Sequence, residues 1–245
     1  MDNNKLVCKN CSYDLVGNFC SNCGQKAGTF RITFRELFHH IPHAVFHIDH
    51  GFFYTAKELA FRPGHTIRDY LQGKRKYHFS PFLMLLLLGG FCSYLYGRFH
   101  FKTVLSSVSI DKLELQNGAI AHKYFAYRSF FFCIVCSLGD YLLFYNKKYT
   151  LPEMVVANTF WFCGMMLIQL IYFPVLLLGQ YAQAENGFAI FLVIIAVIYL
   201  GIARMQFYSA RGSLILSGKI IFAMLLYLAI IMLTGQFLVK PLLTP

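Results

Sequence analysis

Two pairs of cysteines near the start of the sequence have the spacing of a metal site. Cys8, Cys11, Cys20 and Cys23 form two C-x-x-C units in the run CKNCSYDLVGNFCSNC. Each unit presents two thiolates from a tight turn, and two facing turns supply the tetrahedral four-sulfur cage that Zn²⁺ prefers. Gly24, directly after the second unit, admits the positive φ of such a turn. The spacing predicts a structural zinc site closed by four ligands; four unrelated free cysteines, or a redox or iron site, are the alternatives.

The remaining cysteines, Cys92, Cys133, Cys136 and Cys163, lie in apolar stretches. The sequence begins MDNNKLVCKNCSYDL, which lacks the apolar core of a secretion signal. We therefore expect the cysteine-rich head to stay in a reducing cytosol, where thiolates bind metal rather than form disulfides. Cys133 and Cys136 share a redox spacing, but their apolar helical surroundings favour a packing role.

A group of histidines follows in the run RITFRELFHHIPHAVFHID. His39, His43 and His47 recur at i, i+4 spacing, which on one helix would align three imidazoles for a transition metal. Pro42 interrupts that helix, so hydrogen bonding of interfacial histidines to headgroups and backbone is the favoured interpretation. The run is amphipathic but too polar to span a membrane, and we expect it to lie at the interface.

Three polar residues in or beside apolar stretches form a second candidate site. Asp140, Glu153 and Gln169 lie where charged groups are costly and normally face protein or water. Two carboxylates near one membrane face would suit a proton or cation path. The favoured alternative is that Asp140 bonds to a neighbouring Tyr or to Gln169 and joins helices. Arg128 is too far to pair with Asp140, because twelve residues of helix span about 18 Å.

The segment between the histidines and the first apolar stretch is basic. Thr55 and Glu58 fit a capping box at the start of a short helix that Arg62-Pro63-Gly64 ends, and a second short helix is predicted from Thr66 to Gly73. A basic cluster beside an apolar stretch usually stays cytoplasmic and attracts anionic headgroups. The predicted headgroup-binding residues are Arg68, Lys74, Arg75 and Lys76.

The composition is that of a membrane protein. Of 245 residues, 57% are hydrophobic and only 13% are charged, and the mean hydropathy is +0.52. The net charge of +11 fits cytoplasmic loops and anionic lipid, so we do not expect a nucleic-acid partner. About twenty apolar residues cross a bilayer. The five predicted spans are Ser80–Tyr96, Phe125–Tyr145, Met154–Leu178, Phe188–Met205 and Leu214–Val239.

Loop charges set the predicted orientation. Lys147 and Lys148 precede the third span, and Arg204 and Arg211 are assigned to the loop before the fifth, so both loops should be cytoplasmic. The loop from Gly179 to Gly187 has no basic residue and should be external. Five spans then place the C-terminus outside. The basic excess in the segment after the first span is the discordant feature.

The order of several motifs resembles the DUF3667 family of bacterial membrane proteins, found chiefly in Bacteroidota. The matching motifs are CxNC, GxFCxxCGQK, RITFRELF, DxGFxxTxxxL and PGxxIRDYLxGKRxxxxxPF, all in about the first third of the chain. The remaining two thirds match in general hydropathy. The resemblance implies a membrane architecture and assigns no activity.

Together these features predict an all-α polytopic membrane protein with a zinc ribbon at residues 1–28, an amphipathic interfacial elbow at 29–78 and a transmembrane helical domain at 79–245. The favoured function is that of a scaffold or accessory subunit whose zinc head docks a protein partner at a bacterial inner membrane. A small transporter or lipid-handling protein, and a membrane enzyme acting on lipid headgroups, are the alternatives. No nucleotide loop, HExxH or serine nucleophile motif is present, which weakens the enzyme hypothesis.

Overall fold

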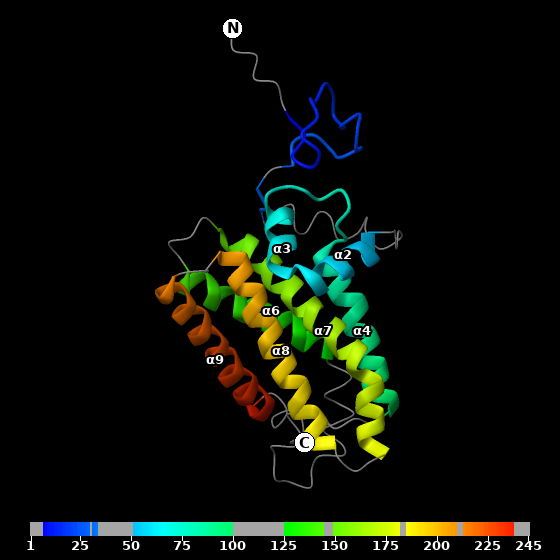
Figure 1. Cartoon of the computed structure of the whole chain (residues 1–245), viewed down its shortest axis with the longest axis vertical. Coiled ribbons are helices and arrows are strands. Elements are labelled where there is room, and N and C mark those ends of the chain that lie inside the picture. Colours follow the sequence, from blue (N-terminus) through cyan, green and yellow to red (C-terminus); the bar gives the residue numbers. More distant parts are fainter. Residues whose placement is uncertain are drawn as a thin grey trace.

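The chain folds into helices below a small cysteine-rich head (Figure 1). The computed structural model describes residues 7–29, 31–33, 51–99, 125–144, 149–181, 185–209 and 213–237. Its helices are α2 (Gly51–Phe61), α3 (Pro63–Leu71), α4 (Pro81–Phe99), α6 (Phe125–Leu143), α7 (Leu151–Tyr181), α8 (Glu185–Tyr208) and α9 (Leu214–Phe237). In the described residues, the only extended pairings are two isolated bridges in the head, Val7 with Asp14 and Phe19 with Lys26.

The long helices stand side by side as a bundle. α4, α7 and α9 run away from the head, and α6 and α8 run back toward it (Figure 1). α7 contacts α4, α6 and α8, while α9 packs on α6 and α8. α7 is therefore the central helix, and its apolar residues Val156, Phe160 and Trp161 are almost fully buried.

Among the helices that the structure describes, three are long and apolar enough to cross a membrane. These segments are Pro81–Phe99, Leu151–Gly179 and Ile190–Tyr208. The described parts of α6 and α9 contain shorter apolar segments, Ser129–Leu143 and Leu214–Tyr227. The helical, membrane-compatible architecture expected from composition is confirmed, and the count of five spans stays a prediction.

The two short helices lie at the head end of the bundle. α2 ends where Pro63 begins α3, because proline fits the first turn of a helix and not the interior of the preceding one. Gly64 lets α3 approach α8 closely, since a Cβ there would lie 2.4 Å from the Ala203 carbonyl oxygen. Its N–H also donates to Gln206 Oε1 at 3.1 Å.

The predicted capping role of Thr55 is wrong. α2 begins four residues earlier, at Gly51, and Thr55 is a fully buried residue inside the helix. Its Oγ1 accepts a hydrogen bond from Phe79 N at 2.7 Å. Thr55 therefore ties α2 to the residues just before α4 rather than starting a helix.

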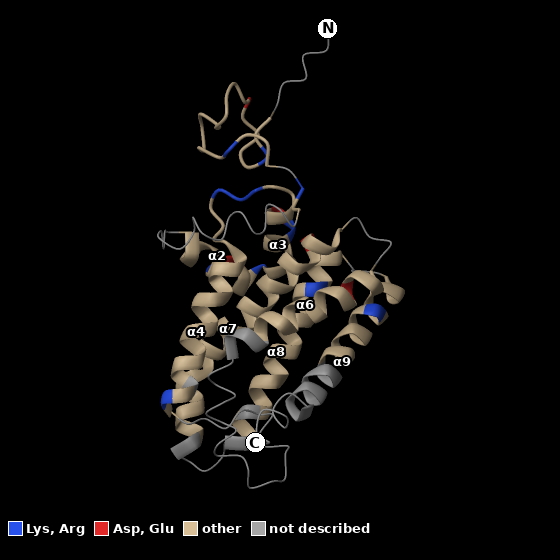
Figure 2. Cartoon of the chain, turned by 180° about the vertical axis from the view of Figure 1, so that it is seen from behind, with Lys and Arg blue, Asp and Glu red and all other residues tan. Residues whose placement is uncertain are grey.

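Among the described residues, most Lys and Arg lie at the head end of the molecule (Figure 2). They lie in the head, in the loop between α3 and α4, and near the ends of the helices there, while Arg98 in the last turn of α4 lies at the far end. Lys147 and Lys148, which set the predicted orientation, lie outside the described residues, so the orientation stays a prediction.

Candidate functional site

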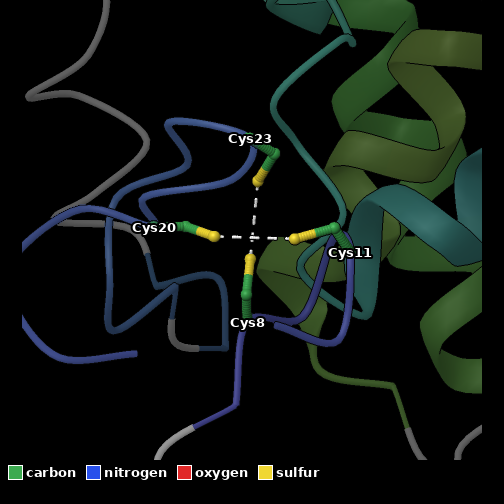
Figure 3. Close-up of side chains that lie close together, drawn as sticks. All are labelled: Cys8, Cys11, Cys20 and Cys23. Atoms are coloured by element: carbon green, nitrogen blue, oxygen red, sulfur yellow. Dashed lines mark hydrogen bonds between the residues drawn. The ribbon is translucent and has the colours of Figure 1, made fainter. Parts of the chain in front are cut away.

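The four predicted metal ligands converge in the head. Their Sγ atoms all lie within 4.8 Å of one another and point toward a common centre (Figure 3). Cys8 and Cys20 are buried, whereas Cys11 and Cys23 are half-buried. Cys8 Sγ is 3.6 Å from Cys23 Sγ, and Cys11 Sγ is 3.5 Å from Cys20 Sγ. The group can hold a metal ion.

The two C-x-x-C turns have the same local structure. In the first, Ser12 N donates to the Cys8 carbonyl, and in the second Gly24 N donates to the Cys20 carbonyl, each at 2.8 Å. The residue after each second cysteine has a positive φ, 59° at Ser12 and 71° at Gly24. The positive φ predicted for Gly24 is thus confirmed, and each turn directs two thiols to one side.

The electrostatics of the thiols favour a shared cation. The backbone N–H of Gln25 is the main cause that lowers the pKa of Cys23 to about 6, and the N–H of Cys23 likewise lowers the pKa of Cys20. For Cys11, the N–H of Tyr13 acts in the same direction, but burial and the neighbouring thiols outweigh it and raise the pKa to about 11. Four thiolates cannot ionise together at this distance without a positive ion between them.

Gln25 fastens the head to the loop between α3 and α4. This side chain is only 4% exposed. Its Nε2 donates to the Gly73 carbonyl at 2.9 Å, and its Oε1 accepts from the N–H groups of Arg75 and Lys76 at 3.0 and 3.1 Å. Gly73 has a φ of 103°, which only glycine adopts readily. Gln25 was not predicted as a contact residue from the sequence, although it lies in the CGQK motif and its partners Gly73 and Arg75 lie in the GKR motif.

Most of the basic residues predicted to bind headgroups have intramolecular partners. Lys74 Nζ pairs with Asp69 Oδ1 at 2.8 Å. Arg75 Nε donates to the Tyr70 carbonyl at 3.2 Å, and its guanidinium lies over the Tyr70 ring. Arg68 hydrogen-bonds to Ser209 and His65, and Lys76 is exposed.

Asp140 lies in a buried polar cluster at the head end of the bundle. Its Oδ2 accepts hydrogen bonds from Asn158 Nδ2 at 3.0 Å and from Arg204 Nη2 at 3.3 Å. Arg204 lies between two aromatic rings, with its Cζ 4.7 Å from the Trp161 centroid and 4.5 Å from that of Tyr227. α6, α7, α8 and α9 all contribute to the cluster.

The assignment of Arg204 to a cytoplasmic loop is wrong. α8 continues to Tyr208, and the Arg204 side chain is 2% exposed. The loop assignment failed because an arginine near the end of an apolar stretch is ordinarily a flanking charge. The presence of Asp140 in another apolar stretch was the available signal, since buried charges pair with one another.

The other two residues of the predicted polar site lie elsewhere. Glu153 is 4% exposed and pairs with Arg31 Nε at 2.8 Å. Gln169 is half-buried on α7, sixteen residues further along, which corresponds to about 24 Å of helix. The described contacts join Asp140 to neither of them.

Cys133 and Cys136 are buried in α6, which agrees with their predicted packing role. Cys133 Sγ lies 3.2 Å from Thr159 Oγ1, and Tyr227 donates to the Cys136 carbonyl at 2.8 Å. The histidine group from His39 to His50 and Arg211 lie outside the described residues.

Residues 49–91 match the model of the family described as "Protein of unknown function (DUF3667)". The chain resembles the DUF3667 family. The DUF3667 match covers α2, α3, the basic loop and the first half of α4, so it includes the Gly73–Lys76 segment that holds Gln25. The comparisons with curated proteins and with solved structures found no match.

Proposed function

We propose that this chain is a bacterial inner-membrane scaffold or accessory subunit, with five spans, a cytosolic zinc ribbon and a periplasmic C-terminus. The zinc head docks a protein partner. The observation that carries the proposal is the closed group of four thiols on a head fastened to the membrane body. Such a site has no open coordination position for substrate, which is typical of structural rather than catalytic zinc.

The surface of the head supports a docking role. Three apolar side chains on it are strongly exposed: Tyr13 at 52%, Val16 at 97% and Phe19 at 64%. Val16 and Phe19 lie in the loop between the two C-x-x-C turns, where a bound metal would fix their positions. Aromatic and aliphatic side chains presented on a rigid frame are the usual anchors of a protein interface.

The orientation has a separate support. Among the described residues, the Lys and Arg at the head end match the cytoplasmic excess of basic residues in membrane proteins. The pairing of Asp140 with Arg204 favours a helix-joining role over a cation path, because the carboxylate is already neutralised. The transporter hypothesis therefore gains no support from this residue.

Metal analysis tests the site. We expect one Zn²⁺ per chain in protein purified in detergent, and we expect Cys23→Ser to lose it. Cys136→Ser is the matched control, because this thiol is buried in α6 away from the head. A wild-type protein that folds fully without any metal would contradict the structural zinc site.

Photo-crosslinking in native membranes tests the docking role. A photoreactive phenylalanine analogue at Val16 or Phe19 should give one discrete protein adduct, and Cys23→Ser should abolish it. Leu178 on α7 is exposed to 67% and serves as the control position, where we expect lipid adducts alone. Absence of a protein adduct from both head positions would refute docking while leaving the metal result intact.

A further inference from the structure

α2 exposes one continuous face that carries three aromatic rings. Phe53 is 75% exposed, Tyr54 42% and Phe61 76%. With Lys57, which is also exposed, they occupy positions i, i+1, i+4 and i+8 of the helix. At 100° per residue these positions share one side, and the buried residues Thr55 and Leu59 lie on the other.

The opposite side of α2 explains why this face points outward. Thr55 accepts the hydrogen bond from Phe79 N, and Phe52 packs edge-on against the Phe79 ring with centroids 5.6 Å apart. Leu59 is fully buried, and its carbonyl accepts a hydrogen bond from Tyr199 OH at 3.1 Å. These contacts fix the inner face of α2 to Phe79, just before α4, and to Tyr199 on α8. The aromatic rings on the opposite face therefore point away from the bundle.

The placement of α2 is that of an interfacial helix. It lies across the ends of the long helices rather than alongside them (Figures 1 and 2). Tyr77, 53% exposed, extends the face from the loop before α4, with its ring centroid 6.0 Å from that of Tyr54. Further along the chain, α4 exposes Leu86 and Phe91. The aromatic face of α2 thus lies close in sequence to α4, an apolar helix that is long enough to cross a membrane.

From these observations we infer that the face formed by Phe53, Tyr54, Lys57 and Phe61 inserts into the boundary between headgroups and acyl chains of an anionic bilayer. The rings suit this boundary because aromatic side chains concentrate at membrane interfaces. Lys57, at the centre of the face, buries its methylenes among them and extends its ammonium to lipid phosphate. The inference rests on the proposed membrane location of the bundle and adds a second, in-plane attachment at its head end.

Tryptophan reporters test the inference in vesicles of phosphatidylglycerol and phosphatidylethanolamine. Phe53→Trp and Phe61→Trp change exposed rings and should not disturb folding. The native Trp161 is 1% exposed, so the emission of the wild-type protein can be subtracted. We expect blue-shifted emission that is quenched more by lipids brominated near the headgroup than by lipids brominated near the chain end.

Two controls separate failure of this inference from failure of the membrane location. Phe91→Trp on α4 reports the bundle, and Phe19→Trp reports the head, which we expect to stay in water. If position 91 is quenched but 53 and 61 behave like 19, the inference is wrong and the bundle still spans. If position 91 is not quenched, the membrane location itself fails. Blue-shifted but unquenched emission at 53 and 61 would mean that protein covers the face, which also overturns the inference.

The charge component has its own test. Lys57→Glu in the Phe53→Trp protein should weaken quenching in phosphatidylglycerol vesicles and leave it unchanged in phosphatidylcholine vesicles. Lys26→Glu in the head is the matched control, because Lys26 is exposed and distant in sequence from α2. Equal quenching of the Lys57→Glu and parent proteins in phosphatidylglycerol would refute contact between Lys57 and anionic lipid.

Discussion

Asp140 on α6 and Arg204 on α8 form an ion pair in which Nη2 lies 3.3 Å from Oδ2, and their side chains are 0% and 2% exposed. Asn158 provides a second hydrogen bond to the carboxylate, while Trp161 and Tyr227 enclose the guanidinium. Both charges have lost their water, so each depends on the other for compensation. The pair therefore joins α6 to α8, two helices that α7 separates in the chain.

Arg204→Ala should strongly destabilise the bundle. The substitution leaves the Asp140 carboxylate buried without its counter-charge, and loss of one partner of a buried pair costs about 3–5 kcal/mol. We expect a lower thermal midpoint in detergent, followed through the fluorescence of Trp161, the one tryptophan of the chain.

The matched control is Arg62→Ala, which removes an exposed i, i+4 pair with Glu58. Exposed pairs contribute about 0–1 kcal/mol, so this midpoint should hardly move. The double variant Asp140→Leu/Arg204→Met should recover much of the loss, since it removes both buried charges together. A midpoint for Arg204→Ala equal to that of Arg62→Ala would disprove the buried pair.

Gln25→Ala should loosen the head without emptying its metal site. The side chain makes three hydrogen bonds to the Gly73–Lys76 loop, and each is worth about 0.5–1.5 kcal/mol. Hydrogen exchange at the Arg75 and Lys76 amides should accelerate, while zinc content stays constant. Lys26→Ala, at the exposed neighbouring position, should leave both unchanged. Unaltered exchange in Gln25→Ala would contradict the attachment.

Local sequence patterns predicted those features whose physics is local. The C-x-x-C turns form from a few consecutive residues, and Pro63 ends α2 through its own ring. The T-x-x-E pattern shows the limit of such reasoning. It predicted a helix cap at Thr55, but the Thr55 hydroxyl accepts a hydrogen bond from Phe79 N inside the fold. The same pattern at Thr150 and Glu153 does lie at the start of α7, where Thr150 N donates to the Glu153 carboxylate.

Pairings across long sequence separations could not be predicted. Asp140 and Arg204 are 64 residues apart, and Gln25 is 48 residues from Gly73. Composition predicts which stretches are apolar, but the face that each helix turns to its neighbour depends on packing with helices far along the chain. A single sequence therefore predicted the head and the apolar helices, and missed the contacts that join them.

Glu153 has two roles at the start of α7, which substitution can separate. Its Oε2 accepts from Thr150 N at 2.8 Å, as the third residue of a capping box does, and its carboxylate pairs with Arg31. Glu153→Gln keeps an acceptor for the cap and loses the ion pair. Glu153→Ala loses both and should destabilise by about 1 kcal/mol more, measured by thermal unfolding.

Arg31→Ala provides the comparison for the ion pair alone. Arg31 is 59% exposed, so solvent screens the pair. Arg31→Ala still leaves the Glu153 carboxylate, 5% exposed, without its cation, so we expect it to destabilise somewhat more than Glu153→Gln, which removes the charge. If Glu153→Ala and Glu153→Gln had the same midpoint, Glu153 would not act as a cap.

His78 should make the stability of the elbow depend on pH. Burial among Tyr54 and Tyr70 lowers the pKa of its imidazole from the ordinary value of 6.5, against the opposing influence of Asp69 and Glu58. The unfolded state then binds the proton more readily than the folded state, so stability is complete above pH 6.5 and decreases as the pH falls below it. Intrinsic-rate-corrected hydrogen exchange of residues 74–80 should accelerate between roughly pH 7.5 and pH 5.5 in the wild-type protein, and His78→Gln should lack this acceleration because its amide does not titrate. An equal acceleration in both proteins would assign the effect to another group, since the substitution removes the only imidazole between Gln72 and Arg98.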